Sequence, residues 1–218
     1  MSGMVKRWMK HMVLLLLLAG CGAQPTERFA LGETVMREDF TTSFAWEEYV
    51  NLDQKVDFQL QDGAYRARAW DGGFMWAIKP PAHTDVVVEV ETIQLSDDGS
   101  VAYGVMCRAA PTDNSDGYYF LIGGDGYYTI RRGSTDRIGA LIPFTYSGAI
   151  RQGRGVNRVR AVCIGDYLAL YVNGEFVAET RDDYFSRGYT GLAAGVVEGG
   201  DVDVAFDDLT VWAASLLP

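Results

Sequence analysis

The chain has 218 residues, with 29 acidic side chains against 19 basic ones, 25 glycines and 48% hydrophobic residues. This length suits one domain that buries a sizeable core. The acidic balance argues against a nucleic-acid partner, because phosphates attract Lys and Arg.

The first 20 residues have the pattern of a secretory signal. Lys6, Arg7 and Lys10 give a positive start, and residues 12–18 form an apolar run that is too short to span a membrane. The sequence Leu-Ala-Gly-Cys that ends at Cys21 resembles the bacterial lipobox. This resemblance implies that Cys21 becomes the lipidated first residue of the mature protein. The alternative is an ordinary signal peptide followed by a chance cysteine.

Removal of this signal would leave an acidic, exported chain. Residues 1–20 carry three basic and no acidic side chains, so the remaining 198 residues have a net charge of −13. This charge argues against docking on anionic headgroups, and the lipid on Cys21 would provide the membrane anchor. We therefore expect a signal at 1–20, a tether at 21–34 and one domain at 35–218, located outside the cytoplasm at the cell envelope.

Strand patterns follow one another along the domain, and none of the chain shows a helical period. Pro80-Pro81 should break strand pairing, and residues 136–153 are less regular and should cover a sheet edge. A first strand and a loop are expected within 38–49. Further strands are expected at 56–60, 64–70, 74–78, 85–94, 100–109, 117–122, 127–131, 157–164, 191–198 and 202–212, together with a hairpin at 165–180.

The hairpin is centred on Asn173-Gly174, a pair typical of the two-residue type I′ turn because both positions need φ > 0. This turn predicts that Tyr171 lies opposite Phe176 and that Leu170 lies opposite Val177. By alternation, one face should carry Leu168, Leu170, Val172 and Val177, and the other should carry Ala169, Tyr171, Phe176 and Ala178. Apolar residues on both faces suit a strand pair inside a packed two-sheet body.

Seven stretches together resemble the concanavalin A-like lectin/glucanase superfamily. Within it they are most similar to bacterial domains grouped with 3-keto-disaccharide hydrolases and to laminin G-like modules. The resemblance covers residues from about 38 to the end. It implies an all-β fold, a jelly roll of two curved antiparallel sheets whose concave face often meets sugar in relatives. The stretches are YGVMCR (103–108), DGYYFLI (116–122), DGYYTIRR (125–132), the strand from Asn157, LALYVNGEFV (168–177), YFSRGYTGLAA (184–194) and VAFDDLTVW (204–212).

Catalytic patterns are weak in this sequence. Glucanases of the superfamily carry an ExDxxE-type strand, whereas Glu89-Val90-Glu91 lacks the third carboxylate and reads as a solvated strand face. A Ser-His-Asp triad would need His83, and no GxSxG elbow accompanies it. Within residues 35–218, one histidine and two cysteines do not form a recognisable zinc set. We therefore assign no catalytic residue.

Aromatic side chains are the better candidates for ligand contacts, since sugar rings stack on flat aromatic faces. Most of them must lie in the core of a sandwich of this size. We select Arg108, Tyr119 and Tyr171, because strand alternation points their neighbours Cys107, Tyr118 and Leu170 inward and sends these three to the opposite faces.

Carboxylates near the two ends of the domain could hold a structural calcium ion, which prefers oxygen ligands. Asp207 belongs to the last strand, and Asp39 is its candidate partner near the first strand, a position where superfamily members often hold calcium. The alternative is that these side chains only cap turns. We expect no other cofactor.

Cys107 and Cys163 form an even pair in a compartment that permits disulfides. Both point inward by strand alternation, next to Tyr103 and Val105 in one strand and to Val159 and Ala161 in the other. The sequence predicts a Cys107–Cys163 bond of structural type, and the alternative is two separate buried thiols.

These patterns predict a membrane-anchored binding module for glycan or another envelope polymer, without catalysis. One alternative is a glycoside hydrolase-type enzyme that acts on saccharides. Another is a structural module that contacts another envelope protein. The ligand and the oligomeric state stay open.

Overall fold

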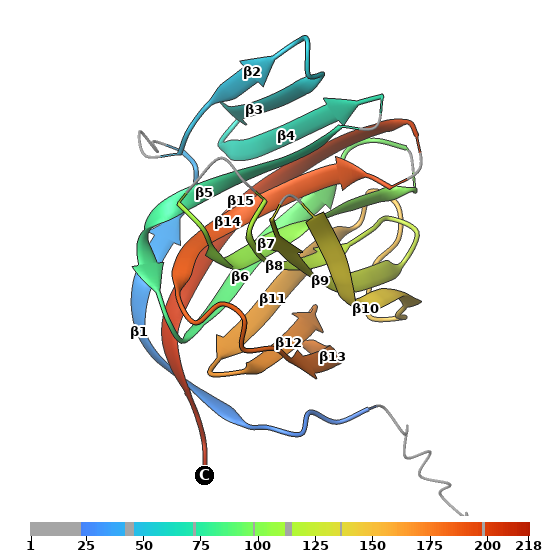
Figure 1. The fold of residues 1–218 in the computed structure, drawn as a ribbon. Coiled ribbons are helices and arrows are strands. Elements are labelled where there is room, and N and C mark those ends of the chain that lie inside the picture. Colours follow the sequence, from blue (N-terminus) through green and yellow to red (C-terminus); the bar gives the residue numbers. More distant parts are fainter. Residues whose placement is uncertain are drawn as a thin grey trace, which may run out of the picture.

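The protein consists of two antiparallel β-sheets packed face to face (Figure 1). The computed structural model describes residues 23–41, 46–71, 73–97, 99–111, 115–135, 137–197 and 199–218. Within these ranges the regular elements are all strands, and no helix is long and apolar enough to cross a membrane. The expected all-β, two-sheet jelly roll is confirmed. Cys21 and the expected signal lie outside the described residues.

The larger sheet has nine strands among the described residues, in the order β13-β12-β11-β6-β15-β4-β3-β2, with β1 also paired to β15. In Figure 1, β2, β3 and β4 lie at one end of the molecule, and β12 and β13 lie at the other. The strands are β1 (Phe29–Glu38), β2 (Tyr49–Asn51), β3 (Val56–Gln61), β4 (Ala64–Trp70), β6 (Val86–Gln94), β11 (Val156–Ile164), β12 (Tyr167–Val172), β13 (Glu175–Arg181) and β15 (Asp201–Leu216).

The smaller sheet has six strands in the described part of the chain, in the order β10-β9-β8-β7-β14-β5. Its edge strands are therefore β10 and β5. The strands are β5 (Phe74–His83), β7 (Val101–Ala109), β8 (Gly117–Ile122), β9 (Tyr127–Ser134), β10 (Arg137–Tyr146) and β14 (Gly188–Val196).

The main core lies between the two sheets, and strand alternation selects its members. In β4 the residues alternate between buried and partly exposed, which sends Tyr65, Ala67 and Ala69 inward. In β7 and β8 the inward residues include Tyr103, Val105, Tyr118 and Phe120. Both cysteines point into this core, as predicted.

The Cys107–Cys163 disulfide is confirmed, with Cα atoms 6.8 Å apart and 56 residues of sequence separation. Cys107 lies in β7 of the smaller sheet, and Cys163 lies in β11 of the larger one. The bond therefore joins the two sheets through the core.

The Asn173-Gly174 hairpin forms as predicted, with φ of 54° at Asn173 and 83° at Gly174. Tyr171 pairs with Phe176, but Leu170 pairs with Ala178 instead of Val177. A β-bulge at this point inserts one extra residue into β13. The bulge turns Ala178 toward the main core, so its expected place on the opposite face is wrong.

The first strand begins earlier than the sequence indicates. Residues 29–34, expected in the tether, are part of β1, which pairs with β15 from Phe29–Leu216 to Glu38–Leu209. The segment before β1 is also bound to the sheet, because the Thr26 amide donates to Glu179 Oε2 of β13 at 2.9 Å. Residues 29–34 of the range expected as a tether therefore belong to the sheet, since periodicity alone gave no sign of the distant partner strand.

One further expectation is confirmed and two need correction. Pro80-Pro81, joined by a cis peptide bond, interrupts the pairing of β5 with β14 between Lys79–Thr190 and His83–Gly188, although β5 itself continues to His83. Residues 137–146 form the edge strand β10, although two register shifts against β9 disguise its alternation. β15 runs on to Leu216, beyond the end expected at Trp212.

Candidate functional site

The three predicted ligand residues lie in three separate places. Arg108 is buried at one end of the sandwich, Tyr119 lies on the outer face of the six-stranded sheet, and Tyr171 lies on the outer face of the nine-stranded sheet. The structure therefore does not bring them together into one site.

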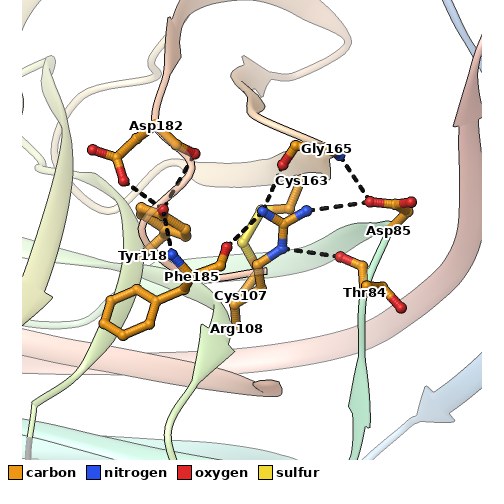
Figure 2. A network of polar contacts seen from close by, with 9 residues as sticks. All are labelled: Thr84, Asp85, Cys107, Arg108, Tyr118, Cys163, Gly165, Asp182 and Phe185. Carbon is orange, nitrogen blue, oxygen red and sulfur yellow. Dashed lines mark hydrogen bonds and ion pairs between the residues drawn. A yellow bond between two sulfur atoms is a disulfide. The ribbon is translucent and has the colours of Figure 1, made fainter. Parts of the chain in front are cut away.

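Arg108 is a structural residue with a side chain only 1% exposed. Its φ of 54° interrupts the alternation of β7, so its side chain does not follow the outward direction of Met106. Nε donates to Thr84 O at 2.9 Å, and Nη1 donates to Gly165 O at 2.7 Å and to Phe185 O at 2.9 Å (Figure 2). Arg108 thus joins three connections that are distant in sequence.

Charge at Arg108 is balanced by Asp85, whose Oδ1 lies 3.2 Å from Nη2 (Figure 2). Burial lowers the pKa of Arg108, and the Asp85 carboxylate opposes this effect. Asp85 Oδ1 also accepts a hydrogen bond from the Gly165 amide at 2.8 Å. An arginine held in this way is engaged by protein groups, so its expected ligand role has no support in the structure.

Tyr118 extends the same network toward the 182–187 connection. Its hydroxyl donates to Asp182 Oδ1 at 2.5 Å and accepts from the Phe185 amide at 3.0 Å (Figure 2). Burial, followed by the Asp182 carboxylate, raises the pKa of Tyr118 to about 12. Arg132 completes the cluster at 2.6 Å from Asp182 Oδ2. Each of these groups has a protein partner, which is typical of a structural network.

The outer surface of the six-stranded sheet, here called the six-stranded face, carries Tyr119. The side chain has the predicted direction, opposite to Tyr118, but it is fully buried. Its hydroxyl donates to Ser115 O at 2.6 Å, and burial raises its pKa above the usual range. Tyr119 therefore lies beneath the surface of this face, and its burial gives no support to the expected direct contact with a ligand.

Small residues form the middle of the six-stranded face. Strand pairing places Gly191 between Met106 and Ile78, and it places Ala193 between Gly104 and Trp76. Gly195 lies in the same way between Ala102 and Phe74. Larger side chains lie on both sides of these small residues.

The rings of Phe74 and Tyr119 approach each other above these small residues. β5 and β8 are separated by β7 and β14, so their backbones are about 14 Å apart. The ring centroids of Phe74 and Tyr119 are nevertheless only 5.8 Å apart. A Cβ atom on Gly195 would lie 2.3 Å from Phe74 Cδ2. Glycine at this position therefore allows the Phe74 ring to cross the sheet.

The most exposed aromatics of this face are Tyr127, Phe144 and Tyr146, here called the aromatic row. Their exposed fractions are 42%, 36% and 56%. Tyr127 and Tyr146 meet edge to face with centroids 5.9 Å apart. Two sequence signals could have identified the row. Tyr127 directly follows the turn residue Gly126, and Phe144 and Tyr146 are two residues apart, which places them on one face of a strand.

Polar groups lie beside the aromatic row. The Arg131 guanidinium lies 5.6 Å from the centre of the Phe144 ring, and Arg131 Nη2 donates to Ile138 O at 3.2 Å. Gln152 Nε2 donates to the Tyr146 hydroxyl at 3.3 Å. Arg131 is also the direct neighbour of Tyr119 in the β8–β9 pairing. The row thus combines flat apolar surface with cationic and amide donors, which suits a polyhydroxylated ligand.

Tyr171 belongs to another cluster, on the outer face of the nine-stranded sheet. It is partly exposed and contacts Phe29 and Phe176, with ring centroids 5.9 Å and 5.5 Å away. Burial raises its pKa, with a further contribution from Glu179. Its position on the sheet opposite to the aromatic row separates it from that site.

Asp39 and Asp207 lie near enough for their charges to interact. Burial, followed by the carboxylates of Asp208, Glu91 and Asp39, raises the pKa of Asp207. Asp39 instead caps its own turn, and its Oδ1 accepts from the Thr41 amide at 3.1 Å. In the part of the chain that the structure describes, no three His, Cys, Asp or Glu side chains form a metal-binding group.

The residues of the weak catalytic patterns, Glu89, Glu91 and His83, lie in settings that do not resemble a catalytic site. Glu89 lies 2.6 Å from Arg160 Nε, and Glu91 lies 3.2 Å from Arg158 Nη2, both between β6 and β11 of the nine-stranded sheet. Burial, followed by the charge of Arg187, lowers the pKa of His83. His83 Nε2 makes no hydrogen bond with the described residues.

Comparison with known proteins gives a fold relationship. No protein-family model and no curated protein sequence matches the chain. Carbohydrate-binding module CBM66 from Bacillus subtilis is similar with a TM-score of 0.63 and 15% identity, over 78% of this chain and 96% of that one. A B. subtilis protein of unknown function with a galectin-like fold has a TM-score of 0.65 and 11% identity, over 86% and 99%.

A third neighbour is a Bacillus licheniformis β-glucanase, with a TM-score of 0.61 and 8% identity, over 84% of this chain and 98% of that one. At such identities the likeness concerns the fold alone. The chain therefore has the concanavalin A-like, galectin-like jelly-roll fold that carbohydrate-binding modules and glucanases share.

Proposed function

We propose that the protein is a non-catalytic saccharide-binding module and that the aromatic row of the six-stranded face is its binding surface. The observation that carries this proposal is the exposure of Tyr127 and Tyr146 beside Arg131 and Gln152. Sugar rings stack on aromatic faces, while guanidinium and amide groups bind their hydroxyls. The names of the similar structures, a carbohydrate-binding module and a β-glucanase, agree with a ligand of this class.

A glycan array followed by calorimetry on the best ligand tests this proposal. Tyr146→Ala should weaken binding roughly tenfold or more, which corresponds to about 1.4 kcal/mol. The matched control is Tyr184→Ala, because Tyr184 is also 56% exposed but packs on Arg132 and Phe185, away from the row. Both variants lose one ring pair of similar size, so each should lower the free energy of unfolding by no more than about 1.5 kcal/mol.

Several outcomes would contradict the proposal. Equal losses in the two variants would place the binding surface elsewhere. Failure of every glycan to bind would favour the structural module that contacts an envelope protein. Release of shorter saccharides, measured in the same samples, would favour a glycoside hydrolase-type enzyme.

We also propose that the protein is anchored at the cell envelope through Cys21. This location is supported by the Leu-Ala-Gly-Cys sequence, which follows a positively charged segment and an apolar run. The mature protein should partition into detergent and carry acyl mass on Cys21, and Cys21→Ser should abolish both. A soluble wild-type protein that begins at another residue would refute the anchor.

A further inference from the structure

The outer face of the nine-stranded sheet carries an apolar area, here called the Trp212 patch, which consists of Phe29, Tyr171, Phe176, Trp212 and Leu216. These side chains are partly exposed and rest on a layer of buried residues, namely Val87, Val162, Ile164, Tyr167 and Ala169. An antiparallel sheet that faced only water would carry polar side chains here. A patch of this kind marks an interaction surface.

The remainder of this face is charged and paired, which sets the limits of the patch. Arg160 pairs with Glu89 and Arg158 pairs with Glu91 on the strands beside it. At the other limit, Leu31 and Leu217 are 43% and 39% exposed at the β1–β15 end. Apolar exposure is therefore continuous from Tyr171 toward the end of the molecule where β1 begins.

The N-terminal chain reaches the body at this same place. Thr26 is bound to Glu179 of β13, and Glu27 forms an ion pair with Arg181 of the same strand. Phe29, three residues later, is itself a member of the patch. In Figure 1 the chain before β1 passes beneath β12 and β13.

The short connection limits how far the body can stand from an anchor at Cys21. Five residue steps separate Cys21 from Thr26, and a fully extended chain covers at most about 18 Å over five steps. Because Thr26 is held against β13, an anchor at Cys21 keeps the β13 edge and the neighbouring Trp212 patch close to the membrane surface. This step rests on the anchoring proposed above.

We propose that the Trp212 patch docks on the lipid–water interface and directs the six-stranded face away from the membrane. Trp and Tyr side chains are well suited to this interface, because each has an apolar ring and a polar group. The chain is acidic overall, so charge does not drive the contact. The anchor supplies a high local concentration instead, and this makes a weak apolar contact sufficient.

The orientation follows from the two-sheet architecture. The patch and the aromatic row belong to the outer faces of different sheets, with the main core between them. When one face contacts the bilayer, the other is turned toward the surroundings. The ligand surface is then presented outward without a long tether.

The test uses residues 21–218, which contain every contact described above, coupled through the Cys21 thiol to maleimide lipid in phosphatidylcholine vesicles with brominated acyl chains. The other two of the three cysteines are bonded to each other, so the coupling is specific. Bromine should quench tryptophan fluorescence. Trp212→Phe should remove more than half of the quenching, whereas Trp76→Phe, on the six-stranded face, should leave it unchanged.

A second measurement needs no substitution. Amide hydrogen exchange of wild-type protein compares β13 with β10, two edge strands at different places in the sandwich. Coupling to vesicles should slow exchange several-fold in β13 and leave β10 unchanged. Absence of quenching, its loss in Trp76→Phe, or slower exchange in β10 instead of β13 would overturn the proposed docking.

Chemical coupling separates this inference from the anchoring proposal. Lipid is attached at Cys21 in the vesicle experiment whether or not cells acylate it. Acyl mass on protein from cells tests the anchor alone. Docking that fails on coupled protein therefore refutes the membrane role of the patch, even where natural acylation is found.

Discussion

Substitution of Arg108 gives the sharpest test of the structural reasoning. Arg108→Ala removes a buried guanidinium that donates to three backbone carbonyls, of Thr84, Gly165 and Phe185, and pairs with Asp85. The variant leaves those acceptors without their donor and also leaves a void. The stability of the whole domain should fall, because these carbonyls belong to three different connections.

The magnitude follows from the number and type of these contacts. A hydrogen bond to a charged group contributes about 1.5–3 kcal/mol, but contributions from one side chain do not add, and desolvation of the guanidinium is recovered on its removal. The Asp85 side chain is 44% exposed, so water can solvate its carboxylate once Arg108 is removed, and the cost comes from the three carbonyls and the void. Truncation of a large buried side chain to alanine typically costs about 3–5 kcal/mol. We expect a loss in this range, which corresponds to roughly 10 °C in Tm for a domain of this size.

Urea unfolding with the disulfide intact measures the effect as a lower midpoint at unchanged slope. Arg154→Ala is the matched control, because the Arg154 side chain is 61% exposed and pairs with Asp97 at 89% exposure, so its loss should cost less than about 0.5 kcal/mol. Arg108→Lys keeps the charge but cannot reach all three carbonyls, and it should also destabilise. A loss below about 1 kcal/mol in Arg108→Ala would refute the reasoning.

Three further predictions address other parts of the fold. Replacement of Cys107 and Cys163 by Ala should lower the free energy of unfolding by about 4 kcal/mol, because the bond closes a loop across 56 residues; equal stability of the variant and the oxidised protein would contradict this. Tyr119→Phe removes the donor to a buried carbonyl and should cost about 1 kcal/mol in urea unfolding, with glycan binding unchanged. A raised pKa at Asp207 means that the folded state holds this proton more tightly than the unfolded chain, so stability falls as pH rises through the interval between the ordinary and the raised pKa. Asp207→Asn should therefore raise Tm by on the order of 1 °C at pH 7, with no gain at pH 3, and a lower Tm at pH 7 would count against it.

Much of the fold could be predicted from local patterns. Alternation placed Tyr103, Cys107 and Cys163 in the core, and Asn173-Gly174 gave the hairpin turn. These features depend on the two-residue period of a strand and on the φ angles that a short turn requires. Both are properties of neighbouring residues, so the sequence expresses them directly.

The surroundings of the three expected ligand residues were predicted less well, because they depend on exceptions to that period and on burial. The positive φ at Arg108 interrupts alternation in β7, and a bulge does the same between Leu170 and Ala178. The direction of Tyr119 was predicted correctly, but its burial follows from Phe74, which reaches it across two other strands. No local pattern contains such a contact.

The amino-acid sequence by itself indicated an all-β body and the inward pair of cysteines, since periodicity and turn chemistry act over a few residues, and its resemblance to the superfamily implied the two-sheet jelly roll. Only the tertiary structure decided that Tyr127 and Tyr146 lie together as an exposed surface and that Arg108 lies buried. It also decided that β1 pairs with β15, about as far apart in the domain as two strands can be. The physical reason is that exposure and partner choice depend on packing between distant strands, whereas strand formation depends on neighbours.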